Sequence, residues 1–204
     1  MGHRKYELGK RAERQDETRR RIVAATMELH GTVGPLATTV SAVADLAGVE
    51  RLTVYRHFPT LHELFESCGA LFMETYPLPA LTSDPAPSSP FDRIRATLGA
   101  LYPYYRDREA YLSVFLRDVE QMPELQVLVD TFFLNKLRRG QEWIVAGFAG
   151  SARPAVLAAV MGQAMDFWGW RSWMQQGLTD SEIIEVVATT AVQFAAAPAA
   201  PGAR

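Results

Sequence analysis

The stretch Thr39–Phe65, TVSAVADLAGVERLTVYRHFPTLHELF, predicts two short helices joined by a sharp turn. The first helix is indicated by apolar residues that recur at helical spacing, namely Val40, Val43, Ala44 and Ala47. Gly48 follows, where the chain must turn and a residue without a Cβ atom costs least. Pro59 restricts Phe58 to extended backbone, so the second helix ends there. The pattern is that of a helix-turn-helix unit.

The second of these helices carries polar, aromatic and basic side chains within seven residues. A short helix of this kind suits the major groove of DNA. We expect Arg51 to contact a base, with guanine preferred because a guanidinium offers paired donors. The candidate DNA-binding residues are Thr39, Val40, Arg51, Leu52, Thr53, Tyr55, Arg56 and His57.

This segment resembles the helix-turn-helix of the tetracycline-repressor (TetR) family of bacterial transcription regulators. The matching residues are Arg20–Ala25, Gly34, Thr39-Val40, Val43-Ala44, Ala47-Gly48-Val49, Val54–Pro59 and Glu63-Leu64-Phe65. The resemblance covers roughly residues 18–66. It implies an all-α fold of about nine helices, with an N-terminal three-helix DNA-binding domain and a C-terminal helical domain that binds a ligand and dimerises. It also implies a repressor that binds a palindromic operator as a homodimer and is released by a small hydrophobic or aromatic effector.

Three positions depart from the family pattern. Leu61 stands where the family usually has a lysine that holds a phosphate, and Glu50 opens the second helix where serine is common. His30 occupies a place where an aromatic residue such as Phe is common. The first two departures keep an alternative open, a helical ligand-binding or adaptor protein with weak or lost DNA binding.

Charge is unevenly distributed along the chain. The net charge of the 204 residues is −2, but residues 1–21 carry eight Lys or Arg against four Asp or Glu. We therefore expect a basic, flexible N-terminal arm over 1–17 that can contact phosphates. The DNA-binding domain is expected over 18–60, the effector-binding and dimerisation domain over 61–197, and a disordered tail over 198–204.

Several classes of protein are not expected. The sequence has no apolar run long enough to span a membrane and no secretory signal, and its one cysteine fits a reducing cytoplasm. Its four histidines form no metal-binding motif, and it has no phosphate-cradling loop or nucleophile motif. We expect neither an enzyme nor a bound metal or cofactor.

The C-terminal half predicts helices after a proline-rich loop at Pro77–Pro90, over about 91–106, 109–121, 124–148, 154–177 and 180–196. Two of its helices are apolar on more than one face, which favours a partner subunit on the second face, and the family usually dimerises there. The candidate dimer residues are Ala158, Gly162, Met165, Ile184, Val187 and Ala191. A monomeric core is the alternative.

Aromatic side chains also concentrate in this half. The resemblance implies an effector pocket lined by aromatic residues with a few polar groups among them. The candidate pocket residues are Tyr105, Tyr111, Phe115, Phe132, Trp143, Gln163 and Asp166. Asp166 interrupts a long apolar run, so it could contact an effector, pair with Arg171 or Arg117, or face solvent.

Overall fold

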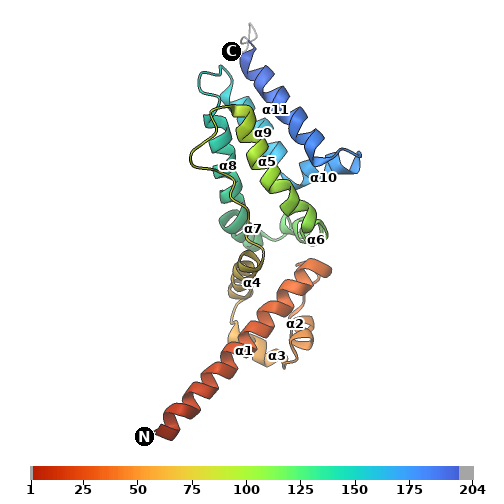
Figure 1. Cartoon of the computed structure of the whole chain (residues 1–204). Helices are drawn as coiled ribbons and strands as arrows, with labels where there is room; N and C mark the ends of the chain where they lie inside the picture. The colour runs from red at the N-terminus through yellow and green to blue at the C-terminus, as the bar shows by residue number, and fades with distance from the viewer. Residues whose placement is uncertain (1, 198–204) are drawn as a thin grey trace. The chain divides into compact units, whose positions relative to one another are not determined.

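The computed structural model describes the backbone of residues 2–197 and the side chains of residues 9–197. This part of the chain is helical throughout and contains no strand, so the expected all-α fold is confirmed (Figure 1). The elements are α1 (Gly2–Thr32), α2 (Val40–Ala47), α3 (Arg51–His57), α4 (Leu61–Thr75), α5 (Pro90–Asp107), α6 (Glu109–Val119), α7 (Pro123–Val129), the π-helical segment η1 (Asp130–Leu134), α8 (Asn135–Ala146), α9 (Pro154–Met165), α10 (Phe167–Gln175) and α11 (Asp180–Ala196).

The described residues contain more helices than the nine or so expected, because two predicted long helices are interrupted. Residues 124–148 were expected to form one helix, but η1 separates α7 from α8. Residues 154–177 divide at Asp166, whose extended backbone (φ −75°, ψ 139°) ends α9 and caps α10. Asp commonly occupies such a cap, since its carboxylate accepts an unpaired N–H of the first turn.

The helices form two compact units. The first contains the chain up to Pro77 together with Ala110–Phe132, and the second contains Leu78–Glu109 and the chain from Phe133 onward. None of the helices among the described residues is long and apolar enough to cross a membrane.

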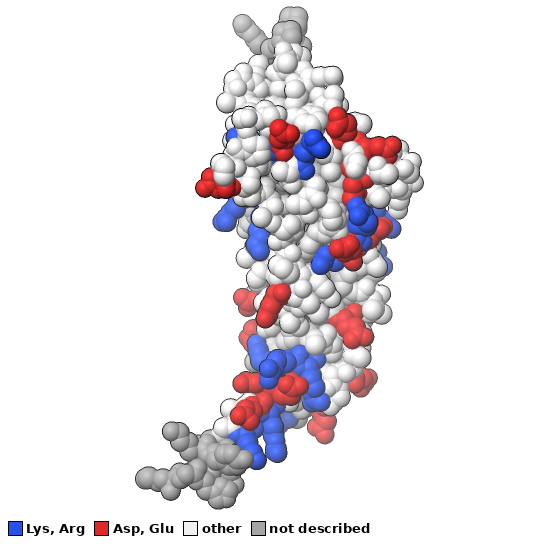
Figure 2. Space-filling view, viewed as in Figure 1, with Lys and Arg blue, Asp and Glu red and all other residues white. Residues whose placement is uncertain are grey.

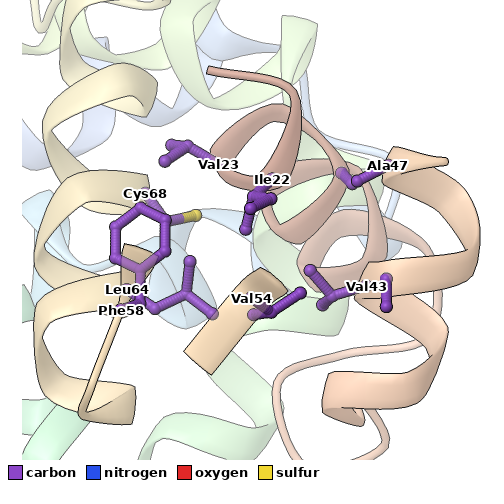
Figure 3. Packing of buried hydrophobic residues seen from close by; sticks show 10 residues of the cluster. Ile22, Val23, Val43, Ala47, Val54, Phe58, Leu64 and Cys68 are labelled. Atoms are coloured by element: carbon purple, nitrogen blue, oxygen red, sulfur yellow. The ribbon is translucent and has the colours of Figure 1, made fainter. Parts of the chain in front are cut away.

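The core of the first unit joins α1 to the three helices that follow it. Side chains from all four helices meet in it, and Figure 3 shows them pointing toward one another. The buried members are Ile22, Val23, Ala25, Val43, Ala44, Ala47, Val54, Phe58, Leu64 and Cys68. Burial along α1 begins at Ile22, while the described side chains before it are exposed or half-buried.

Capping residues fix both ends of α2 and the beginning of α4. Thr39 accepts a hydrogen bond from the N–H of Ala42 at 3.1 Å and so begins α2. Gly48 ends α2 in the left-handed region (φ 64°), where a residue without Cβ is favoured. Thr60 caps α4 in the same way as Thr39 caps α2, by accepting from the N–H of Glu63 at 3.2 Å.

The second unit packs α5 against α11 and α8 against α9. Two buried tyrosines of α5 satisfy carbonyl groups that the break between α9 and α10 leaves free. Tyr102 donates to the carbonyl oxygen of Ala164 at 2.9 Å, and Tyr105 donates to that of Met165 at 2.6 Å. Trp170 is fully buried beside both rings and donates to Asp180 at 3.0 Å.

Candidate DNA-binding surface

Helix α3 turns one residue inward and most of the others outward. Val54 is 1% exposed and belongs to the core, whereas Leu52 is 64% and Tyr55 43% exposed. Arg51 and Arg56 are exposed as well, and the predicted contact residues Thr53 and His57 are half-buried. A helix this short buries little, so its exposed polar and basic side chains are available to a partner.

Contacts along α3 organise its side chains before any partner binds. Arg51 donates to the hydroxyl of Tyr55 at 3.3 Å, and its guanidinium carbon lies 5.7 Å from the centroid of that ring. Arg56 donates to the hydroxyl of Thr53 at 2.8 Å. A guanidinium has five N–H donors, so each arginine keeps donors for another acceptor.

The beginning of α2 presents the other predicted contacts. Thr39 is exposed, and its hydroxyl oxygen is already the acceptor in the helix cap. The hydroxyl proton remains able to donate, which is the role a phosphate contact needs. Val40 is half-buried against the core of the first unit.

Arg19 of α1 connects the end of α3 with α4 through hydrogen bonds, a role that was not predicted from the sequence. It donates to the carbonyl oxygen of His57 and to the hydroxyl of Ser67, both at 3.0 Å. Its guanidinium carbon lies 4.1 Å from the centre of the Phe58 ring. Burial and the nearby charges of Arg19 and Arg56 lower the pKa of His57, so its imidazole is neutral at pH 7 and donates without a charge.

A hollow lies between the first half of α1 and α3. It is lined by Arg11, Arg14, Gln15, Asp16, Thr18, Arg19, Thr53, Arg56 and His57. Lys and Arg side chains gather over this part of α1 in Figure 2, with acidic side chains among them. A flexible arm is expected from the sequence over 1–17, but α1 is helical from Gly2 onward. The spacing of Arg11, Arg14 and Thr18 could have indicated a helix with these side chains on one face, because residues three and four apart share a helix face.

Two of the three departures from the family pattern lie at the surface, whereas the third, His30, is buried. Glu50 precedes α3 and makes no side-chain cap with it. Leu61 is 49% exposed at the first position of α4. Neither residue belongs to the core, so both can be substituted without loss of packing.

The candidate pocket residues are divided between the two units. In the first unit, Tyr111 stacks on Phe72 and Phe115, with ring centroids 4.8 and 5.9 Å apart, and Phe132 lies beside Gly69. The other four candidates, Tyr105, Trp143, Gln163 and Asp166, belong to the second unit.

Those four residues have different environments within the second unit. Tyr105 is fully buried, and Trp143 is half-buried with the guanidinium of Arg93 5.2 Å from its ring centroid. Gln163 and Asp166 are exposed. Asp166 accepts from the N–H of Gly169 at 2.9 Å, while Arg171, one of its two expected partners, pairs with Glu109 at 3.0 Å.

The other expected partner of Asp166 is also engaged elsewhere. Arg117 donates to Asp118 at 2.7 Å within the first unit. Within the second unit, the carboxylate of Asp166 thus caps α10, while Arg171 is engaged with Glu109.

The candidate dimer residues face in two directions. Met165, Val187 and Ala191 are buried within the second unit, whereas Ala158, Gly162 and Ile184 are half-buried. The same helices also expose large apolar side chains, with Val156 and Val160 on α9 and Val186 and Val192 on α11. Among the residues whose side chains are described, no group of three His, Cys, Asp or Glu residues is placed to hold a metal ion.

Comparison with known proteins relates this surface to a family. Residues 22–68 match the model of the family described as bacterial regulatory proteins, tetR family. The chain is 32% identical over 146 residues to the HTH-type transcriptional repressor KstR of Mycobacterium tuberculosis (strain ATCC 25618 / H37Rv), a match that covers 66% of this chain and 64% of that protein. The chain thus spans less than two thirds of the length of this relative.

Solved structures share the fold at low sequence identity. A putative TetR-family transcriptional regulator from Syntrophomonas wolfei str. Goettingen is 16% identical with a TM-score of 0.55, covering 92% of this chain and 99% of that one. The multidrug binding protein EbrR, complexed with imidazole, is 19% identical with a TM-score of 0.52, covering 89% and 92%. At these identities the likeness shows the fold alone.

Proposed function

Since this chain belongs to the tetR family of bacterial regulatory proteins, we propose that it is a transcriptional regulator that binds an operator in double-stranded DNA through helix α3. The observation that carries this proposal is the division of α3 between one buried residue, Val54, and a row of exposed basic, aromatic and apolar side chains. Arg51 reads a base, Leu52 and Thr53 lie against base edges, and Thr39 and Tyr55 donate to phosphates. The regulator acts in the cytoplasm, where its DNA lies.

The regulator works as a homodimer on a palindromic site. Two copies of α3 must fall roughly 34–36 Å apart to enter successive major grooves. Helices α9 and α11 supply the interface, since both expose valines beside the half-buried Ala158, Gly162 and Ile184. Exposed apolar side chains that gather on neighbouring helices favour association with a second apolar face.

A small hydrophobic or aromatic effector releases the DNA, so the regulator is a repressor, as the name of its relative KstR describes that protein. Half-buried rings of the first unit, Tyr111 and Phe115, support an aromatic lining. The effector changes DNA affinity only by as much as it prefers one conformation of the dimer over the other.

The test is a selection of DNA by the full-length protein from a library of random duplexes. We expect an enriched palindrome that binds two chains, as sedimentation measures, and that binds at least about 10³-fold more tightly than a scrambled duplex. If no sequence is enriched and both duplexes bind alike, the chain is instead a ligand-binding or adaptor protein, the alternative that Glu50 and Leu61 leave open.

A further inference from the structure

We propose that the hollow between α1 and α3 binds a phosphate group of the DNA backbone, with Arg11 and Arg14 as the principal cationic contacts. This inference rests on the proposed function and deepens it, because it adds a contact from residues upstream of the segment that matches the family model, 22–68.

The geometry of α1 brings these side chains to one face. Positions 11, 14, 15, 18 and 19 recur three or four residues apart, so their side chains project from the same side of the helix. This face borders Thr53, Arg56 and His57, which lie on the half of α3 that follows Arg51 and Leu52. The hollow therefore has one wall from each helix, and both walls carry donors.

The hollow has a strong excess of positive charge. Four guanidinium groups line it, from Arg11, Arg14, Arg19 and Arg56, against the single carboxylate of Asp16. Arg19 and Arg56 donate to uncharged oxygens, and neither Arg11 nor Arg14 forms an ion pair within the described residues. An anion that enters the hollow meets two guanidinium groups, those of Arg11 and Arg14, that are not paired with a described carboxylate, which favours a strong charge-assisted hydrogen bond.

The position of the hollow beside α3 points to the DNA backbone as the source of that anion. When α3 lies in the major groove, the phosphates of the flanking strands lie next to the helix. A phosphate in the hollow would accept from both walls, as phosphate contacts that fix the register of a protein on DNA do. Such a contact strengthens binding to every sequence and leaves the choice of bases to α3.

The experiment compares Arg11→Gln/Arg14→Gln with the unaltered full-length chain on a selected duplex and on a scrambled duplex, over a range of salt concentrations. Both substitutions are at exposed positions, so they leave the fold intact. We expect affinity for both duplexes to fall by roughly tenfold at low salt, and the slope of log K against log salt to lose about 0.9 for each phosphate contact removed. The base preference should not change.

Two single substitutions sharpen the test. Arg20→Gln removes an exposed cation of the same helix that pairs with Glu17 at 3.3 Å and does not line the hollow, so we expect an unchanged slope. Asp16→Asn removes the one carboxylate of the hollow and should tighten binding to both duplexes.

Three outcomes overturn the inference while the proposed function stands. One is sequence-specific binding with an unchanged slope in the Arg11/Arg14 variant, and another is an equal loss in Arg20→Gln, which indicates diffuse attraction to the helix. The third is calorimetric binding of free pyrophosphate that depends on Arg11 and Arg14 while their substitution leaves DNA binding unchanged. Absence of any sequence-specific binding contradicts the proposed function itself.

Discussion

Asp118 accepts a hydrogen bond from the backbone N–H of Leu36 at 3.2 Å, so a buried carboxylate of α6 holds the segment that leads from α1 into α2. Arg117 completes the contact, since it donates to Asp118 at 2.7 Å and to the carbonyl oxygen of Val33 at 3.3 Å. The hydrogen bond from Arg117 lowers the pKa of Asp118 by more than burial raises it, and the carboxylate is ionised at neutral pH.

Gly34 is required at this contact both by its backbone conformation and by the close approach of Asp118. Comparing its substitution with that of Gly150 separates the two effects. Its φ is +95°, and a Cβ atom would lie 2.2 Å from a carboxylate oxygen of Asp118. We expect Gly34→Ala to lower the stability of the first unit by about 2–4 kcal/mol, from backbone strain and the clash together. Gly150→Ala is the control, because its φ is +91° and nothing lies within 4 Å of its Cβ position.

Hydrogen exchange measures the opening free energy of each unit in these two variants. The control should lose only the cost of backbone strain, about 1–2 kcal/mol. An equal loss in both variants contradicts a steric role for Asp118.

The buried His30 makes the stability of the first unit depend on pH between about 4 and 6.5. It is 1% exposed, and burial, partly opposed by the charge of Asp118, lowers its pKa from 6.5 to about 4. Below pH 6.5 the unfolded chain binds a proton that the folded chain rejects, so stability falls as the pH drops from 6.5 to 4. The loss from this group is about 3 kcal/mol when the pH is below both pKa values.

His30→Phe tests this dependence, because a phenyl ring can pack against Phe65 as the imidazole does. The free energy of unfolding of the variant should change less between pH 7 and pH 4.5 than that of the unaltered chain. His62→Gln, at an exposed position of the same unit, is the control and should keep the original dependence. If the free energy of unfolding of His30→Phe changes with pH as that of the unaltered chain does, His30 is not the source of the dependence.

The helix-turn-helix could be predicted from the sequence because its signals are local. Apolar residues at helical spacing form α2, Gly48 turns the chain, and α3 ends at Phe58 before Pro59, as the sequence predicts. The contacts of Asp118 and Arg19 could not be predicted, since each joins residues far apart in the chain, 82 positions for Asp118 and Leu36. No periodicity encodes such a contact.

The C-terminal half shows the same limit in a different way. Apolar periodicity identified α9 and α11, but both helices are apolar on several sides. The sequence therefore could not separate Val187, which packs inside the chain, from Val186, which is 59% exposed. Burial against α5 makes that distinction, and it depends on the fold as a whole.

Asp166 is expected to stabilise α10 whatever its role toward an effector. Asp166→Ala removes the acceptor for the N–H of Gly169 and should cost about 1 kcal/mol in the free energy of unfolding. Asp166→Asn keeps an acceptor and removes the charge, so its stability should stay within about 0.5 kcal/mol of the original. If Asp166→Asn keeps its stability but no longer binds a cationic effector that the unaltered chain binds, the carboxylate contacts that effector. If both variants lose equal stability, the uncharged cap is not the source of the loss.

The proposed dimer interface predicts that charge on the exposed faces of α9 and α11 yields monomers. Val160 is 40% exposed, so Val160→Glu combined with Val186→Glu leaves the intrachain core intact. Sedimentation should show one chain per particle, with normal helicity by circular dichroism. Val127→Glu on α7 is the control, because Val127 lies in the first unit and is as exposed as Val186, both at 59%. This variant should remain dimeric. A double variant that still dimerises places the interface elsewhere.

Arg51 carries the sharpest prediction about specificity. Arg51→Ala should lose roughly 1–3 kcal/mol of binding free energy on the selected duplex and relax the preference at one base position. Tyr55→Phe is the matched control, because it removes only the hydroxyl that accepts from Arg51 and keeps the ring 5.7 Å from the guanidinium. It should weaken binding to selected and scrambled duplexes to the same small extent, as loss of a phosphate contact does. Selection from a random library with each variant measures both effects. If Arg51→Ala keeps the base preference and Tyr55→Phe loses it, Tyr55 contacts that base and Arg51 does not.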